Sequence, residues 1–335
     1  MPIFMIGTQR SGSNLLRLML HQSPDLVAPH PPHILQKMRP LLPLYGDLGD
    51  AERFNLLVDD VCRLVETNPV AWRESPFDRP HILERCKDRS LLSVLAAIYD
   101  QHMCDFGARD WVCKSLANVH FLDEIKAHFN GAVRFIYLYR DGRDVALSFQ
   151  KAVVGEKHIY SIAKQWHEDQ QAALAFCRDH EDAAFGLAYE DLTDDPAPVL
   201  KRLCDFLGIG FNRDMLAPHS SQEAAATSVA GDLWSNVSRP ILQNSQKFRT
   251  QMPPESLRIF EAVAGDSLRA LGYELVSGPP ADGVPFDAAE IARFEEENQQ
   301  LKERFMRDNA GSADLKNRAP QEEVVQSIRR RAADG

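Results

Sequence analysis

The chain has 335 residues, of which 44% are hydrophobic, so it is long enough for one large α/β domain with a deep core and is not a disordered protein. Its formal net charge of −10 leaves no excess of positive charge to hold a polynucleotide, so we expect no nucleic-acid partner. The six cysteines are scattered without a C-x-x-C pair, which predicts reduced thiols rather than a zinc site or a disulfide framework.

We expect no secretory leader, because the first apolar run, Ile3 to Ile6, leads directly into a glycine-rich turn. No stretch approaches the roughly 20 apolar residues that a membrane-spanning helix requires. The sequence therefore predicts a cytoplasmic protein without a membrane span.

The N-terminal segment, residues 2–22, predicts a short buried strand, a tight polar turn and then a helix with an apolar stripe. A proline-rich passage at residues 23–36 follows, and its four prolines exclude a continuous helix. We expect this passage to cross the surface as a loop near the strand ends. From Asp50 to about Asp105 the apolar spacing predicts several helices.

Three later segments read as strands: Trp111–Cys113, Val133–Tyr139 and Phe185–Ala188. After the last of them, the polar group at residues 193–195 predicts the start of a helix, and Gly208 predicts its end. Strands separated by helical stretches predict an α/β fold with three layers, in which a central parallel sheet carries helices on both faces.

The composition shifts to proline, glycine and charge after Tyr273, which predicts a domain over residues 1–275 and a helical appendage over 276–335. Within the appendage, five residues spaced alternately by three and four form a heptad seam: Ile291, Phe294, Asn298, Leu301 and Phe305. The seam covers only about two heptads, whereas a coiled coil needs about three or four. We therefore favour a helix docked on its own domain, with a homodimer through this helix as the alternative.

The turn between the first strand and helix has the glycine spacing of a phosphate-binding loop. Glycines let the backbone curl so that N–H groups point inward, and the helix N-terminus adds positive charge. The loop residues that we expect around an anion are Gln9, Arg10, Ser11, Gly12, Ser13 and Asn14. Nucleoside triphosphatases follow the second glycine with lysine and a hydroxyl residue, but here Ser13 and Asn14 follow it, and the positive charge lies at Arg10.

Two motifs together resemble the sulfotransferase family that uses 3′-phosphoadenylyl sulfate (PAPS). The stretch TQRSGSNLLRLML, residues 8–20, resembles the family's 5′-phosphosulfate loop, and FIYLYRDGRDVALSF, residues 135–149, is similar to its 3′-phosphate segment. Weaker similarities extend to about residue 275. The resemblance implies a P-loop-type fold and transfer of a sulfuryl group from PAPS to an acceptor hydroxyl or amine, without a required metal.

The resemblance also implies roles for single residues. Arg140 and Ser148 would bind the 3′-phosphate, and a guanidinium and a hydroxyl near a helix start suit a phosphate dianion. Tyr189 and Lys247 would help to enclose the nucleotide. The pair that would stabilise the leaving phosphate is Arg10 and Lys114, while Arg143 and Asp144 are expected only to shape the turn.

The general base of the small-molecule cytosolic members is absent. Their histidine lies two residues after the lysine, where this chain has Leu116. The tyrosylprotein members instead take a carboxylate from the segment after the first helix, and this chain has APHPPHIL there. Histidine is matched to proton transfer at neutral pH, so His33 is our first candidate and His30 our second. For either histidine alone, capping or packing of the proline-rich loop is nearly as good an interpretation, but we expect at least one of the pair to be functional. The pattern is closer to the tyrosylprotein and carbohydrate members than to the cytosolic ones.

Two other functions compete with this one. A phosphate-loop kinase or nucleoside triphosphatase is opposed by the missing lysine and by the lack of an evident acidic strand for magnesium. A non-catalytic nucleotide-binding scaffold is opposed by the presence of both Arg10 and Lys114, since binding alone needs less. The acceptor stays open among a sugar, a lipid, a phenol, a peptide tyrosine and a small alcohol.

Overall fold

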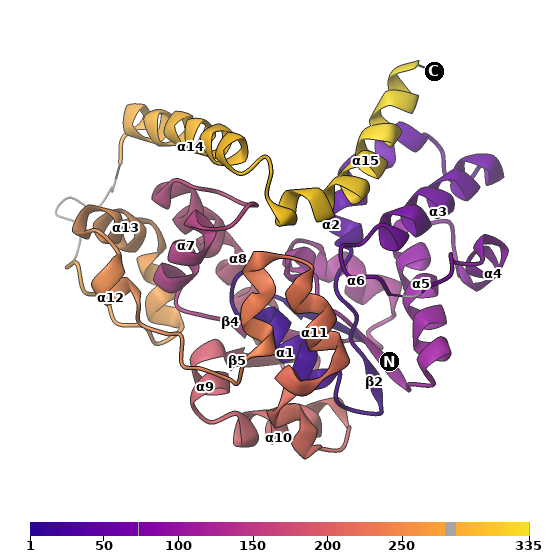
Figure 1. The fold of residues 1–335 in the computed structure, drawn as a ribbon, viewed down its shortest axis with the longest axis horizontal. Coiled ribbons are helices and arrows are strands. Elements are labelled where there is room, and N and C mark those ends of the chain that lie inside the picture. Colours follow the sequence, from indigo (N-terminus) through magenta and orange to yellow (C-terminus); the bar gives the residue numbers. More distant parts are fainter. Residues whose placement is uncertain (73, 279–285, 335) are drawn as a thin grey trace.

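A five-stranded parallel sheet forms the centre of the protein (Figure 1). The computed structural model describes residues 1–72, 74–278 and 286–334. The strands stand in the order β2-β3-β1-β4-β5, and each neighbouring pair is parallel. Their bounds are β1 Pro2–Ile6, β2 Leu26–Val27, β3 Asp110–Cys113, β4 Arg134–Tyr139 and β5 Ala184–Ala188.

Helices make up most of the rest of the described chain. The α-helices are α1 Ser13–Leu20, α2 Ile34–Met38, α3 Ala51–Glu66, α4 Arg79–Arg85, α5 Leu91–Phe106, α6 Leu122–His128, α7 Gly142–Gln150, α8 Ile159–Asp179, α9 Tyr189–Asp194, α10 Pro196–Leu207, α11 Gln222–Val229, α12 Phe248–Gln251, α13 Pro254–Ala270, α14 Ala288–Asp308 and α15 Ala313–Asp334. The 3₁₀ helices are η1 Arg39–Tyr45, η2 Leu116–Phe121, η3 Arg213–Leu216, η4 Pro218–Ser220 and η5 Asp232–Ser238.

Side chains of each strand alternate between two cores, one on each face of the sheet. In β1, Phe4 and Ile6 pack with α3, α5 and α8, whereas Ile3 and Met5 pack with α1 and α10. This alternation follows from the two-residue period of a strand. The predicted three-layer α/β/α fold with a parallel sheet is therefore confirmed. A third core joins α7, α8, α13 and α14 beside the sheet.

The strands predicted near residues 111, 133 and 185 are all present, and the helix that was expected to end at Gly208 ends there with a left-handed glycine. The proline-rich passage differs from the prediction of a surface loop. Leu26–Val27 forms the edge strand β2, and residues 26–32 are buried. Burial is tolerated because the carbonyls of the passage find donors: Asn68 and Trp72 both donate to the His30 carbonyl.

Helix α14 is docked on the chain's own domain. Its Phe294 lies 5.2 Å from Tyr160 of α8, centroid to centroid, and its Asn298 side chain accepts from two backbone N–H groups just before α8. Of the five seam residues, Leu301 is 40% exposed. Phe294 and Asn298 of the seam therefore contact the chain's own domain, as expected for a docked helix. The homodimer through this helix stays a prediction.

Helix α15 lies away from α14, at the upper right of Figure 1, where it packs beside α2 and α3. Its Val324, Val325 and Ile328 join the core under α3, and Gln321 donates to the backbone carbonyls of Pro32 and Leu64. Both helices of the predicted appendage therefore contact the first 275 residues. The domain division itself stays a prediction, and part of its predicted linker, residues 279–285, lies outside the described residues.

Candidate active site

A cavity of about 410 Å³ opens where the segments that follow β1, β3 and β4 come together. Parallel strands present their carboxyl ends at one edge of the sheet, which is the usual place for a ligand in an α/β fold. The cavity brings together the predicted site residues Gln9, Arg10, Gly12, Ser13, Asn14, His30, His33, Lys114, Arg140, Ser148, Tyr189 and Lys247. Ser11 belongs to the same loop but is not part of the lining.

Two glycines shape the loop between β1 and α1. Gly12 has φ +88°, and a Cβ there would meet the Tyr189 ring at 2.2 Å. Gly7 has φ +130°, and a Cβ there would meet the Leu138 carbonyl oxygen at 2.3 Å. Only glycine satisfies both constraints. Inside the loop, the Ser11 hydroxyl is buried without a hydrogen-bond partner, which leaves it available to an anion.

Arg10, Arg140 and Ser148 form one cluster. Arg10 Nε donates to Ser148 Oγ at 3.0 Å, and Arg140 Nη1 donates to the Arg10 carbonyl at 3.2 Å. The Arg140 guanidinium lies over the Tyr189 ring, 4.4 Å from its centroid, and also donates to the Asn244 carbonyl. The Nε of Arg140 is buried without a partner. Because a hydroxyl accepts and donates at once, Ser148 can bind Arg10 and still donate to an anion.

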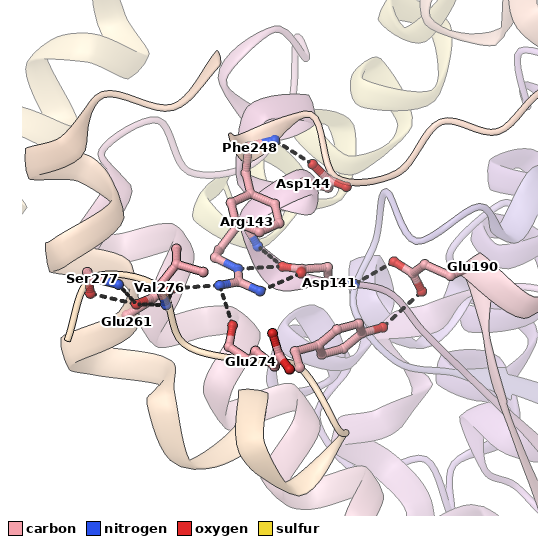
Figure 2. Close-up of polar contacts among 10 residues, drawn as sticks. Asp141, Arg143, Asp144, Glu190, Phe248, Glu261, Glu274, Val276 and Ser277 are labelled. Atoms are coloured by element: carbon pink, nitrogen blue, oxygen red, sulfur yellow. Dashed lines mark hydrogen bonds and ion pairs between the residues drawn. The ribbon is translucent and has the colours of Figure 1, made fainter. Parts of the chain in front are cut away.

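A buried network behind this cluster fixes the start of α7. Figure 2 shows Arg143 between Asp141 and Glu261, with its Nη1 also donating to the Glu274 carbonyl. The Arg143 side chain is only 2% exposed and is not part of the cavity lining. Asp144 accepts from the backbone N–H of Phe248, which holds the segment that carries Lys247 beside α7 (Figure 2). Arg143 and Asp144 therefore have structural contacts, as expected.

The two candidate histidines have different surroundings. His30 is 4% exposed, packs edge-on against Trp234 at 4.6 Å, and receives the Asn68 amide at its Nδ1. With Nδ1 accepting, a neutral His30 carries its proton on Nε2 and is not poised to accept another there. His33 is half-buried, lines the cavity, and has its Nδ1 3.2 Å from Ser115 Oγ.

The contact with Ser115 is compatible with a proton on Nδ1 of His33. Ser115 also hydrogen-bonds the Cys113 thiol, so its oxygen can accept from His33 Nδ1–H and leave Nε2 unprotonated. His33 has φ +59°, a left-handed conformation that is strained for a residue with a Cβ. Burial, together with the nearby charges of Lys114 and Arg318, holds the pKa of His33 well below its ordinary value. His33 is therefore neutral at neutral pH, the form in which it can accept a proton.

The cavity is strongly cationic. Its lining includes Arg10, Lys114, Arg140, Arg239, Lys247 and Arg318, and no Asp or Glu occurs among its described lining residues. Burial and the charges of Arg17 and Arg10 hold the pKa of Lys114 well below its ordinary value. Burial and Arg140 likewise lower the pKa of Arg10 to about 10. Such repulsion between like charges favours binding of an anion that neutralises them.

Sequence reasoning missed several residues of this lining, among them Trp234, Asn244 and Arg318. Asn244 acts through its backbone carbonyl, which no side-chain pattern reveals. Trp234 and Arg318 lie in segments without a phosphate-binding pattern. The resemblance to the sulfotransferase family pointed to this region only through Lys247.

The described residues contain neither a group of side chains suited to a metal ion nor a helix suited to a membrane. Among residues 1–72, 74–278 and 286–334, no three His, Cys, Asp or Glu side chains are grouped so that they could hold a metal ion. In the same part of the chain, no helix has both the length and the apolar character to cross a bilayer.

Comparisons with known proteins agree with this geometry. Residues 2–213 match the family described as the sulfotransferase family. Mouse carbohydrate sulfotransferase 5 is 23% identical over 332 residues, which covers 82% of this chain and 81% of the mouse protein. The sulfotransferase domain of the Synechococcus PCC 7002 olefin synthase has a TM-score of 0.54 at 23% identity and covers 82% of this chain and 96% of that domain. The sulfotransferase domain of the curacin biosynthetic pathway has a TM-score of 0.52 at 22% identity, covering 82% and 98%.

Proposed function

Since the chain belongs to the sulfotransferase family and is an enzyme that transfers a sulfuryl group from PAPS, we propose that the 410 Å³ cavity is its donor and transfer site. The kinase and nucleoside triphosphatase alternative is not favoured by any of the relatives. The observation that carries the proposal is the meeting of a phosphate-binding loop and the cluster of Arg10, Arg140 and Ser148 in one cavity whose described lining residues include no Asp or Glu.

The loop holds the 5′-phosphosulfate of the donor. Its backbone N–H groups, the N-terminus of α1 and the unpartnered Ser11 hydroxyl provide donors for an anion. Arg140, Ser148 and the rim residue Lys247 bind the 3′-phosphate, and Tyr189 packs against Gly12 to close the nucleotide end. Gln9, Ser13 and Asn14 complete the loop. No metal is required, because cationic side chains already supply the neutralising charge.

His33 accepts the proton of the acceptor hydroxyl or amine at its Nε2. As the acceptor atom forms its bond to sulfur, the bond from sulfur to the bridging phosphate oxygen breaks, and the charge on that oxygen grows. Lys114 and Arg10 stabilise this charge. The products are the sulfated acceptor and adenosine 3′,5′-bisphosphate, with the proton on His33. Ser115 Oγ accepts from His33 Nδ1–H in this arrangement and so leaves Nε2 for the proton of the acceptor.

A transfer assay tests the proposal. We expect ³⁵S from labelled PAPS to appear in an acceptor, and sugar hydroxyls come first in the panel because the mouse relative is a carbohydrate sulfotransferase. Lys114→Met should lower turnover by about 10²–10³-fold, the usual loss when one charge-stabilising group is removed. The control, Lys201→Met, changes an exposed lysine of α10 and should leave turnover unchanged. Full turnover in Lys114→Met would contradict the assigned role.

A further inference from the structure

Two cations in the cavity lining, Arg239 and Arg318, have no role in donor binding or in sulfuryl transfer as assigned above, and Arg318 is the less exposed of the two. Arg318 lies in α15, more than one hundred residues beyond the matched segment 2–213, yet it lines the cavity together with His30, His33 and Lys114. The phosphate-binding loop and the Arg140 cluster already supply cations for both anionic groups of the donor. Binding of the donor therefore does not require Arg318.

The fold holds Arg318 at this position from both sides. One residue before it, the Asn317 side chain donates to the Ala230 carbonyl at 2.8 Å. Three residues after it, Gln321 donates to the carbonyls of Pro32 and Leu64 at 3.2 and 3.0 Å. These contacts hold α15 against the domain, so Arg318 lies at the wall of the cavity.

The side chain itself is incompletely satisfied. Its guanidinium carbon lies 5.0 Å from the centroid of the Trp234 ring, and its Nε is buried without a hydrogen-bond partner in the described structure. Asp314, one turn earlier in α15, offsets part of its charge, but Asp314 does not line the cavity. A buried guanidinium beside an aromatic ring and with a free N–H is a ready partner for a carboxylate, sulfate or phosphate.

Arg318 lies at the transfer end of the cavity rather than at the 3′-phosphate end. Its charge acts on His30, His33, Lys114 and Arg10, and its stacking partner Trp234 also contacts the His30 ring. Arg140 and Ser148, by contrast, are tied to Arg10 and Asn244. An anion bound by Arg318 would therefore sit beside the group that receives the sulfuryl.

We propose that Arg318 binds an anionic group of the acceptor, so that the preferred acceptor is a hydroxyl- or amine-bearing acid rather than a neutral alcohol. This inference rests on the proposed function, in which the donor occupies the loop and the Arg140 cluster. Trp234 holds the guanidinium in place, and Arg318 orients the acceptor through a charged hydrogen bond while His33 faces its hydroxyl. Arg318 is in this account a specificity-determining residue.

Matched pairs of acid and methyl ester test the proposal: 3-hydroxydecanoate, 4-hydroxybenzoate and glucuronate, each against its ester. Binding to protein saturated with adenosine 3′,5′-bisphosphate is measured by calorimetry, and sulfate transfer from PAPS is measured on the same pairs. A hydrogen bond to a charged group contributes about 1.5–3 kcal/mol, so at least one acid should bind about 10- to 100-fold more tightly than its ester.

Three variants of α15 separate the outcomes. Arg318→Gln should bring the acid-to-ester ratio close to one without weakening the ester or the bisphosphate, and Arg318→Lys should keep part of the preference. Arg330→Gln, a change of an exposed arginine in the same helix, should keep the wild-type ratio. The inference is overturned if the wild type prefers none of the acids, if Arg318→Gln keeps the preference, or if Arg318→Gln instead weakens bisphosphate binding. Failure of the proposed function would show differently, as absence of bisphosphate binding in the wild type.

Discussion

His33 and His30 are three residues apart and both line the cavity, but His30 is almost fully buried and its Nδ1 accepts from the Asn68 amide, which places its proton on Nε2. Removing the base should lower turnover by about 10²–10⁴-fold, the range that general-base catalysis contributes. Since the donor contacts other residues, His33→Ala should bind adenosine 3′,5′-bisphosphate like the wild type. Steady-state kinetics and a binding titration measure the two quantities.

The matched variant is His30→Ala, in which the buried ring beside Trp234 and Asn68 is lost. It should lower the melting temperature while keeping more turnover than His33→Ala. If His33→Ala had near-normal turnover and His30→Ala did not, the base would be His30.

His33 and Lys114 set the pH dependence of the reaction. His33 must be deprotonated to act, and its pKa lies well below 6.5, so kcat/KM should hold down to that pH and fall only as pH drops through the lowered pKa. Lys114 must be protonated, and its pKa lies well below 10.5, so kcat/KM should fall again before pH 10.5 is reached. The pH profile of kcat/KM measures both limbs. An acid limb that persists in His33→Ala would assign it to another group.

At the scale of elements, the start of α7 depends on a buried ion-pair network. Arg143 pairs with Asp141 and Glu261, so Arg143→Ala leaves two buried carboxylates without their partner (Figure 2). Such a loss costs about 3–5 kcal/mol. Urea unfolding should show this decrease in the free energy of unfolding. Arg258→Ala, which removes an exposed pair with Glu255 on α13, should cost less than about 1 kcal/mol. Equal costs would mean that the network does not stabilise the fold.

The docking of α14 depends on one polar side chain. Asn298 accepts from the backbone N–H groups of Lys157 and His158 at 2.8 and 2.9 Å, so Asn298→Ala leaves both buried groups unpaired. We expect a loss of about 1–3 kcal/mol in urea unfolding, against no change for the exposed Gln299→Ala. If the seam instead pairs two chains, light scattering would show a dimer that Asn298→Ala dissociates, and the docked arrangement would be contradicted.

At the scale of the whole molecule, the sequence predicted best those elements that a local pattern of residues specifies. Hydrophobic runs ending in glycine-rich or charged turns predicted β1, β3, β4 and β5, and the same junctions carried Arg10, Lys114 and Arg140 into one cavity. Since parallel strands end at a common edge, predicting the order of strands and helices was enough to predict this meeting.

Other features depended on contacts between distant segments. Strand β2 has only two residues among prolines, so neither its length nor its composition predicts a strand, and it exists because Asp110 and Trp111 offer a free edge. Arg318 lies within a polar C-terminal segment, and no pattern near it in the sequence indicates that α15 packs beside the cavity. The roles of His30 and His33 likewise diverge through partners 38 and 82 residues away.

The central claim is that this cavity binds the donor nucleotide through its 3′-phosphate, and a melting experiment tests it without knowledge of the acceptor. Adenosine 3′,5′-bisphosphate at about 100 times its Kd should stabilise the protein by about 2.7 kcal/mol. Adenosine 5′-phosphate lacks the group that Arg140 and Ser148 bind, and at the same concentration it should give a much smaller shift, with or without magnesium. Equal shifts for the two nucleotides, or a shift that requires magnesium, would contradict the account.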